Sequence, residues 1–376
     1  MPPKTLNICL FTSILFLLLS ACGASDPDVV PLNKTSAIQL IDSVEIHETD
    51  DRFIGRVAGV DVKLNPFRLY ITDGEMGRVA VVSRDGEIKK LIGRPGKGPG
   101  ELQSPSDVLV GEDYTIVRQG QRAGFEVFDR SGAYKETYHL PAGNWFEGMY
   151  SSMHAIDNGY LLPLTSVDPR EHGVQASAEQ ATIAAVNRNF QIVETFGTFP
   201  TLYQEGEYAA RQRTADVAGD STLAVGYRLV PDIQLYDIGP KEVKQRKTLS
   251  LSHPKFQVPK EEIPMEIARE EDELYERLAE VSGVEYTALF EEGIFVHAFA
   301  NQTKAFYESK FDEEEQTHYA ILGKVDANTR LHLKLPGGVL AHDENDRLYV
   351  ELNPTPDNRK IGIYEVKWPS SARTND

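Results

Sequence analysis

The chain has 376 residues, of which 41% are hydrophobic and 26% are charged, so it is not a mainly disordered protein. Its 57 acidic and 39 basic residues give a formal net charge of −18, which argues against nucleic acid as a partner because phosphate backbones are bound by clustered Lys and Arg. Two cysteines are too few for a disulfide framework or a Cys-rich zinc site.

An apolar run opens the chain at residues 8–19 and leads into the sequence LSACG at residues 19–23. A run of about a dozen apolar residues suits the core of a signal peptide, whereas a membrane span needs about 20. The LSACG sequence resembles the lipobox of bacterial lipoproteins, in which small residues precede a lipid-bearing cysteine. The resemblance implies that residues 1–21 are a signal peptide and that Cys22 carries lipid. The alternative is an ordinary secretory signal, cut near Ala24, that takes Cys22 with it.

The lipoprotein interpretation makes a membrane, bound through the N-terminal lipid, the first expected partner. Residues 22–36 then form the lipidated cysteine and a flexible polar tether. We expect the protein to be located in the bacterial cell envelope, at the outer membrane, facing either the periplasm or the outside. Because Lys4 is the single charged residue of the leader, its removal takes the formal charge from −18 to −19.

From residue 37 onward the sequence is a series of short β-rich runs separated by Gly, Asp and Asn, a pattern typical of all-β proteins. Tight turns, each followed by a β-rich run, recur at residues 65–67, 111–113, 157–159, 218–220, 291–293 and 343–346. A second series of turns follows the third run of these units. Each unit therefore reads as a four-stranded antiparallel meander, which is the blade of a propeller.

The last unit has no fourth strand after residues 361–366, but a spare β-rich run lies at residues 38–46. We therefore predict a six-bladed β-propeller over residues 37–368 that is closed by the N-terminal strand, with a polar tail at 369–376. Closure of this kind removes the open sheet edge that would otherwise favour aggregation.

A glycine-rich stretch, GRPGKGPGEL at residues 93–102, links the first two units. It resembles the G-x-G-P-G-E-hydrophobic linker of bacterial six-bladed β-propeller lipoproteins, which are related to NHL-repeat and TolB-like propellers. The resemblance is detailed in the first two units and elsewhere extends only to the spacing of the blades. It implies a propeller fold and an envelope location, and most members of this group have no defined activity.

The residues beyond the minimal blades fall in insertions at 93–104, 167–180, 197–212, 252–282 and 302–316. In a four-stranded blade these connections share one face, so we expect this long-loop face to bind a ligand; the alternative is decoration without a ligand. The longest insertion predicts a helix within 261–282 that starts near Pro264 and ends at Gly283. We expect it to be a packed cap with a solvated acidic side, and the alternative is a lid over the central channel.

Four arginines are predicted near the long-loop face, with Arg56 and Arg213 opening first strands and Arg118 and Arg228 closing second strands. Together they would bind a carboxylate or phosphate, because a guanidinium group can hold such groups with two hydrogen bonds. Trp145, at the start of the first strand of the third unit, would add an apolar surface on which part of the ligand can stack. The hypothesis depends on strand register, because a slip of one residue turns side chains to the opposite face, and each residue alone is more often a surface or packing residue.

The sequence contains no H-E-x-x-H, G-x-S-x-G or P-loop motif. We therefore expect a binding or scaffold module for a protein, peptide or glycan, without cofactor or metal and without nucleic acid. The alternative is a metal-dependent hydrolase, lactonase or lyase with an axial active site, because a propeller can gather dispersed residues at its axis. The dispersed histidines are His154, His172, His297, His318, His332 and His342. An ion held at the axis by three or more Asp, Glu, Asn or His ligands would favour the enzyme.

Overall fold

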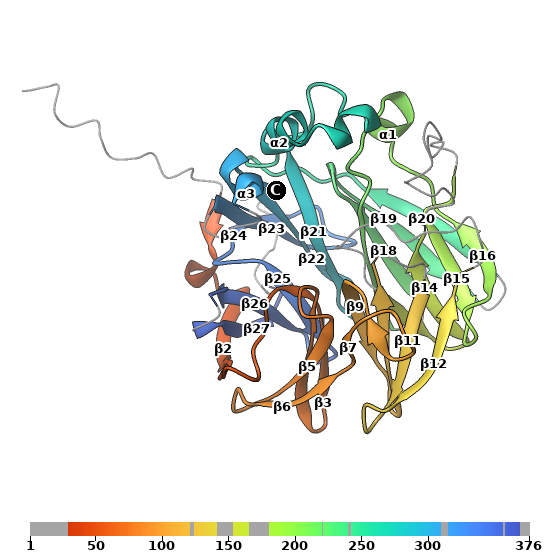
Figure 1. Cartoon of the computed structure of the whole chain (residues 1–376). Coiled ribbons are helices and arrows are strands. Elements are labelled where there is room, and N and C mark those ends of the chain that lie inside the picture. The colour runs from red at the N-terminus through yellow and green to blue at the C-terminus, as the bar shows by residue number, and fades with distance from the viewer. Residues whose placement is uncertain are drawn as a thin grey trace, which may run out of the picture.

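The structure is a computed structural model that describes residues 29–120, 124–140, 153–164, 180–219, 221–239, 242–309, 315–355 and 358–368. Six antiparallel sheets stand around a common axis as the blades of a ring (Figure 1). The predicted all-β, six-bladed propeller is confirmed. In each blade the strands run outward from the axis in chain order, except where the ring is closed.

The first three blades follow one another along the chain. Blade one comprises β3 (Val57–Leu64), β4 (Phe67–Asp73), β5 (Arg78–Ser83) and β6 (Ile88–Ile92). Blade two comprises β9 (Pro105–Val110), β10 (Tyr114–Gln119), β11 (Gly124–Asp129) and β12 (Tyr134–His139). Blade three comprises β13 (His154–Ile156), β14 (Gly159–Pro163), β15 (Ile183–Asn187) and β16 (Ile192–Phe196). The linker between blades one and two contains the short parallel pair β7 (Arg94–Pro95) and β8 (Glu101–Leu102).

The other three blades complete the ring. Blade four comprises β17 (Arg213–Ala218), β18 (Thr222–Tyr227), β19 (Val230–Ile238) and β20 (Val243–Leu249). Blade five comprises β21 (Ser282–Leu289), β22 (Ile294–Gln302), β23 (Gln316–Lys324) and β24 (Arg330–Lys334). Blade six comprises β25 (Val339–Asp343), β26 (Arg347–Asn353), β27 (Lys360–Val366) and the N-terminal β2 (Ile38–Glu45).

The ring is closed by the N-terminal strand, as predicted. β2 lies antiparallel to β27, with Ile38 opposite Val366 and Glu45 opposite Lys360. Gly86, in the β5–β6 turn, lies against the end of β2, where an added Cβ would come within 1.8 Å of the Glu45 carbonyl oxygen. This position has a φ of 82°, so it favours glycine in both conformation and space.

Part of the predicted tether belongs to the folded body. β1 (Val29–Pro31) pairs in parallel with β24 and adds a fifth strand to blade five. The next residues form the short 3-10 helix η1 (Leu32–Lys34), whose Leu32 is buried in the core between blades five and six. The N-terminal segment is therefore held from residue 29, because one apolar side chain in it joins the core.

The core consists, in the described part of the chain, of six buried clusters, one between each pair of neighbouring blades. Strand β5 shows how the sequence builds them. Val79 and Val81 pack toward blade two, whereas Ala80 and Val82 pack toward blade six. Because successive side chains of a strand point to opposite faces, a run that is apolar throughout serves two interfaces at once.

Helices lie at one end of the propeller, at the top of Figure 1. They are α1 (Thr201–Glu205), the 3-10 helix η2 (Met265–Arg269), α2 (Glu271–Ala279) and α3 (Lys304–Glu308). The predicted helix of 261–282 is thus η2 and α2, separated at Glu270. It ends before Gly283 because the Ser282 N–H donates to the Gln257 carbonyl oxygen and starts the inner strand β21. No described helix has the length and apolar character that crossing a membrane requires.

Candidate functional site

The inner strands of all six blades each place one polar side chain at the axis of the propeller. These residues, named here the axial ring, are Asp61 on β3, Asp107 on β9, His154 on β13, Asp216 on β17, Tyr286 on β21 and His342 on β25. They face one another closely enough that the charges of Asp216, Asp61 and Asp107 all act on Tyr286. A close approach of two strands contributes, since Gly59 of β3 leaves no room for a Cβ beside the Asp107 backbone.

The three aspartates of the ring join neighbouring blades. Asp61 accepts the N–H of Val110 in blade two at 2.6 Å, and Asp107 accepts the N–H of Met153, just before blade three, at 2.7 Å. Asp216 accepts the N–H of Leu289 in blade five at 2.6 Å. Each carboxylate therefore satisfies a backbone donor on the next inner strand or at its edge, which stabilises the ring as well as placing negative charge on its axis.

A hydrogen-bonded chain links side chains of blades five, six and four, and its link from blade six to blade four crosses the axis between blades that are not neighbours. The phenol of Tyr286 lies 2.9 Å from Nδ1 of His342, and Nε2 of His342 lies 3.1 Å from the Asp216 carboxylate. On the other side of Asp216, Nδ1 of His154 lies at 3.5 Å. One carboxylate is thus flanked by two imidazoles, and one of these imidazoles reaches a phenol.

The ionisation of the ring follows from burial and from these pairs. Burial raises the pKa of both Asp61 and Asp107 to about 6. Burial, the largest single effect, favours neutral Asp216, but His342, His154 and the Leu289 N–H together outweigh it and leave the pKa of Asp216 below its usual value. Burial opposes a charge on His342, yet Asp216 raises the pKa of that imidazole overall. For His154 burial dominates, so its pKa is lowered and its imidazole is neutral at pH 7.

Solvent reaches the histidines of the ring. The side chains of His342 and His154 are 20% and 16% exposed, whereas that of Asp216 is 3% exposed. Nε2 of His154 is buried and makes no hydrogen bond with any described residue. Within the described ranges, no group of three or more His, Cys, Asp or Glu side chains is arranged to hold a metal ion. The ring can therefore offer hydrogen bonds and negative charge to a ligand.

Three of the four predicted arginines lie inside the protein, in contact with its own groups. Arg118 is fully buried and its Nε donates to the Ser106 hydroxyl at 3.0 Å. Arg213 donates to the carbonyl oxygens of Arg211, at 3.0 Å, and Leu164. Arg228 donates to the Gln302 side chain at 3.0 Å.

Burial and these bonds favour a role for the three arginines in joining loops to blades, and their binding of an external anion stays a prediction. Arg56 is half-buried, with its guanidinium close to Gly74. Trp145 and Cys22 lie outside the described residues.

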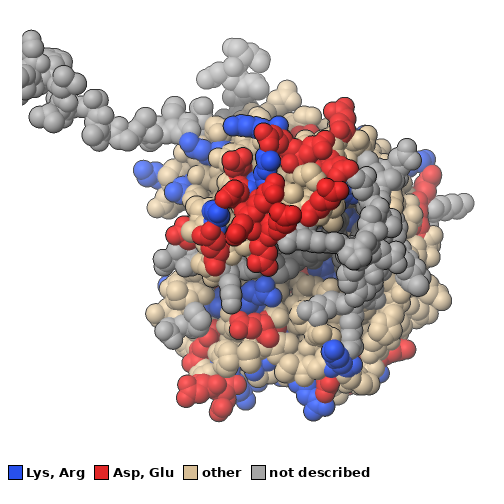
Figure 2. All heavy atoms as spheres, turned by 45° about the horizontal axis from the view of Figure 1, so that its top comes forward, with Lys and Arg blue, Asp and Glu red and all other residues tan. Residues whose placement is uncertain are grey.

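The helical end of the propeller forms an acidic cap. Two insertions join there, since the Ala209 N–H donates to the Ile263 carbonyl oxygen at 2.7 Å. The ring of Tyr275 on α2 stacks on Tyr307 of α3 with 5.2 Å between centroids. Figure 2 shows acidic side chains gathered over this end. The exposed acidic residues on the cap are Glu205, Glu261, Glu262, Glu266, Glu270, Glu271, Asp272, Glu273, Glu276, Glu280 and Glu308.

The sequence matches the family DUF5128, described as 6-bladed beta-propeller, over residues 31–334. The chain belongs to this family. The match covers most of the chain and agrees with the blades described above. The sequence resembled lipid-anchored propellers related to NHL-repeat and TolB-like proteins. Of that resemblance, the six-bladed propeller family is established, and the relation to NHL-repeat and TolB-like proteins stays a prediction. No curated protein is similar enough in sequence to match the chain.

Two solved structures share the fold of this DUF5128 member at low sequence identity. A member of the DUF4221 family from Bacteroides vulgatus is 13% identical with a TM-score of 0.64, and the match covers 89% of this chain and 100% of that one. A Bacteroides fragilis protein named as an exported protein is 12% identical with a TM-score of 0.59, covering 91% and 98%. At such identities the similarity shows the fold alone.

Four members of the axial ring were not singled out from the sequence, although a signal for three of them is present. Asp61, Asp107 and Asp216 are each followed by a valine, and each lies inside the first strand of its blade. Comparison of the first strands with one another, aligned on this Asp-Val pair, would have brought the three together. Tyr286 has no such marker, because its place depends on the bulge of β21 between Val284 and Tyr286.

Proposed function

We propose that this protein is a binding module of the cell envelope, attached to the outer membrane by lipid on Cys22, that binds a basic segment of a peptide or protein at the acidic cap. The observation that carries the proposal is the charge of the long-loop face, where eleven exposed carboxylates gather on one set of insertions. A cationic partner is steered toward such a surface and bound there by complementary charge.

The cap has the rigidity that a binding surface needs. Arg277 pairs with Glu261, and Lys304 pairs with Glu276 at 2.7 Å, so these basic side chains join α2 to its neighbours. Ile267, Leu274 and Leu278 pack against the buried cluster between blades three and four. The remaining acidic side chains therefore stand on a packed base, with their charge available to a partner.

The axial ring also favours a positively charged ligand. Asp61 and Asp107 have a pKa of about 6, so at pH 7 both are largely ionised although burial opposes their charge. A guanidinium or ammonium group beside them would offset the cost of holding charge away from water. His154 adds a buried Nε2 without a hydrogen bond in the described part of the chain. A neutral glycan, the third ligand class of the sequence prediction, gains nothing from this charge.

The test is the binding of a fluorescent peptide of alternating Lys and Gly to the full chain in detergent, followed by anisotropy. We expect binding that weakens strongly between about 0.02 M and about 0.3 M salt. The triple variant Glu271→Gln, Asp272→Asn, Glu273→Gln should weaken binding about tenfold, as expected from the loss of three exposed charge contacts.

The matched control removes the same charge from the opposite face through Asp113→Asn, Glu291→Gln and Glu292→Gln, which are all exposed. This variant should change the affinity by less than about twofold, because its residues lie away from the cap. Equal losses in the two variants would reduce the effect to net charge and refute the cap as the site.

Attachment to the membrane has its own test. The variant Cys22→Ser should abolish labelling of the chain by radioactive palmitate in a bacterial host and release it from the membrane fraction. Labelling that persists in this variant would refute Cys22 as the lipid carrier. Two or more acyl chains on one cysteine hold a protein stably in a bilayer, so the release should be nearly complete.

The chain of Tyr286, His342 and Asp216 favours a second candidate function, an acid–base hydrolase or lyase at the axis. Burial raises the pKa of Tyr286 well above its ordinary value, so the phenol keeps its proton and can donate it. His342, held by Asp216, is the group that would exchange a proton with the phenol. Turnover of any member of a lactone and ester panel, lost in His342→Gln, would establish this function, and no turnover by the wild type would remove it.

A further inference from the structure

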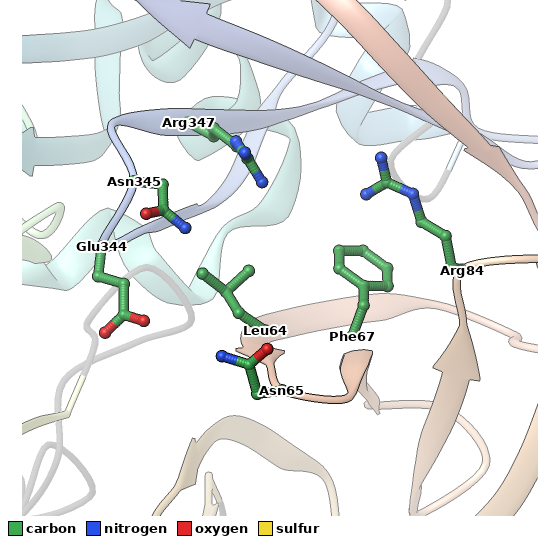
Figure 3. A pocket seen from close by; sticks show the side chains of 7 residues that line it. All are labelled: Leu64, Asn65, Phe67, Arg84, Glu344, Asn345 and Arg347. Atoms are coloured by element: carbon green, nitrogen blue, oxygen red, sulfur yellow. The ribbon is translucent and has the colours of Figure 1, made fainter.

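A pocket of 390 Å³ opens on the face of the propeller opposite the cap, between blades one and six (Figure 3). It is formed by the β3–β4 turn, by the β25–β26 turn and by the residue that follows β5. The two inner strands that lead into it are those that carry Asp61 and His342 of the axial ring. Its size lies at the lower end of the range for small-molecule sites, about 300 to 1,000 Å³.

Two guanidinium groups from different blades point into this pocket. Figure 3 shows Arg84 and Arg347 on opposite sides with their charged ends turned toward each other, whereas the carboxylate of Glu344 turns away from both. Arg84 already pairs with Asp42. The guanidinium of Arg347 forms no hydrogen bond or ion pair with any described residue, which leaves its donors available.

The floor of the pocket is apolar and held in place. Leu64 and Phe67 lie below the two arginines in Figure 3, and Arg84 lies 4.7 Å over the Phe67 ring. Phe67 also stacks with Tyr349 at 6.3 Å between centroids. The turn that carries Asn345 and Arg347 is fixed by Asp343, whose carboxylate accepts the Asn345 N–H at 2.9 Å. The site is therefore formed before any ligand arrives.

We propose that this pocket binds a small organic anion, with its carboxylate or phosphate group between Arg84 and Arg347 and its apolar part on Leu64 and Phe67. The overall charge of −18 gives the protein a negative electrostatic potential that repels anions. Two convergent guanidinium groups make the potential locally positive in this pocket. A planar guanidinium binds carboxylate and phosphate with two parallel hydrogen bonds, and an apolar floor selects anions that carry a ring or alkyl group.

The test uses the full chain in detergent, titrated calorimetrically with phenyl phosphate, benzoate and inorganic phosphate. We expect both ring-bearing anions to bind more tightly than inorganic phosphate, and their order to show which head group the arginines prefer. The variant Arg347→Gln should weaken binding at least about tenfold, the loss expected for one charge-assisted hydrogen bond. Its thermal midpoint should stay unchanged, because the guanidinium makes no contact that the fold requires.

The control variant is Arg130→Gln, which removes an exposed arginine from the same face in blade two. It should leave the affinity unchanged. The proposal is overturned if none of the three anions binds, if Arg347→Gln binds as the wild type does, or if Arg130→Gln weakens binding equally. Equal affinity for inorganic phosphate and phenyl phosphate would overturn the apolar floor as part of the site.

Discussion

Nε2 of His342 on blade six lies 3.1 Å from the carboxylate of Asp216 on blade four, and the pair crosses the axis past blade five. The ring is therefore held by contacts across its centre as well as by contacts between neighbouring blades. The same carboxylate accepts the Leu289 N–H, so Asp216 ties together blades four, five and six.

Asp216→Asn should lower the free energy of unfolding by about 3 kcal/mol at pH 7, because it leaves His342 half-buried without its anionic partner. Chemical denaturation of the full chain measures the loss. The gap between wild type and variant should shrink as the pH falls below 3.8, the ordinary pKa of aspartate, since the lowered pKa of Asp216 stabilises the fold only while the unfolded chain is ionised. Asp113→Asn, at a side chain that is 82% exposed, should cost less than about 0.5 kcal/mol.

His297 predicts a loss of stability in acid. Its imidazole is fully buried on β22, and burial lowers its pKa from 6.5 to about 3. As the pH falls from 6.5 toward 3, the unfolded chain takes up a proton that the folded chain excludes, so the contribution present above 6.5 is lost at up to about 1.4 kcal/mol per pH unit. The variant His297→Leu should lose less stability between pH 7 and pH 4.5 in thermal unfolding.

Asp61 and Asp107 titrate over part of the same range with the opposite sign. Their raised pKa of about 6 means that the folded chain binds protons more tightly, which stabilises it as the pH falls from 6 toward 3.8. Wild type and His297→Leu share this contribution, so the difference between them isolates the histidine. Parallel stability curves for the two proteins would contradict the assignment.

The closing strand offers a matched pair of substitutions. Val44 on β2 is 1% exposed in the interface between blades six and one, whereas Leu40 on the same strand is 54% exposed. Val44→Ala should cost about 2 kcal/mol, from the loss of two buried methyl groups and the cavity they leave. Leu40→Ala should cost less than about 0.5 kcal/mol in the same denaturation experiment. Similar costs would mean that β2 does not seal the ring.

The approach of blades one and two depends on Gly59. An added Cβ would lie 3.0 Å from the Asp107 Cα, so Gly59→Ala should force β3 and β9 apart and cost about 1 to 3 kcal/mol. At Gly338 the nearest atom, on the His318 ring, would be 3.5 Å away, which is ordinary contact. Gly338→Ala should therefore be neutral or slightly stabilising. A thermal shift of equal size in the two variants would contradict this reading of the interface.

The fold was predictable because tight turns require particular residues, such as Gly, Asp and Asn, whatever the distant contacts are. Asn65–Pro66–Phe67 and Asp343 to Asp346 both occupy short turns between first and second strands, as their spacing indicates. The missing fourth strand of the last unit identified Ile38–Glu45 as the closing strand, and the structure pairs it with β27.

The candidate site was harder to predict because it depends on register and on contacts across the ring. Arg118 was expected at an open mouth, but it is fully buried and bonded to Ser106, because side chains of second strands pack between blades. The helix prediction followed apolar spacing through Val281, yet Ser282 begins an inner strand. Contacts outside the local run decide both cases, Arg118 with Ser106 and Ser282 with Gln257, and apolar spacing carries no trace of them.

The pairing of β2 with β27 also determines when during synthesis the ring can close. Glu45 and its partner Lys360 are separated by more than 300 residues. At about 5 to 20 residues per second of synthesis, the first strand waits roughly 15 to 65 seconds for its partner to be made. During this interval Ile38 and Val44, on the buried face of β2, have no blade to cover them. A chain built in this way cannot close its ring until its last strand is available, so the pairing of β2 with β27 comes after the synthesis of all six blades.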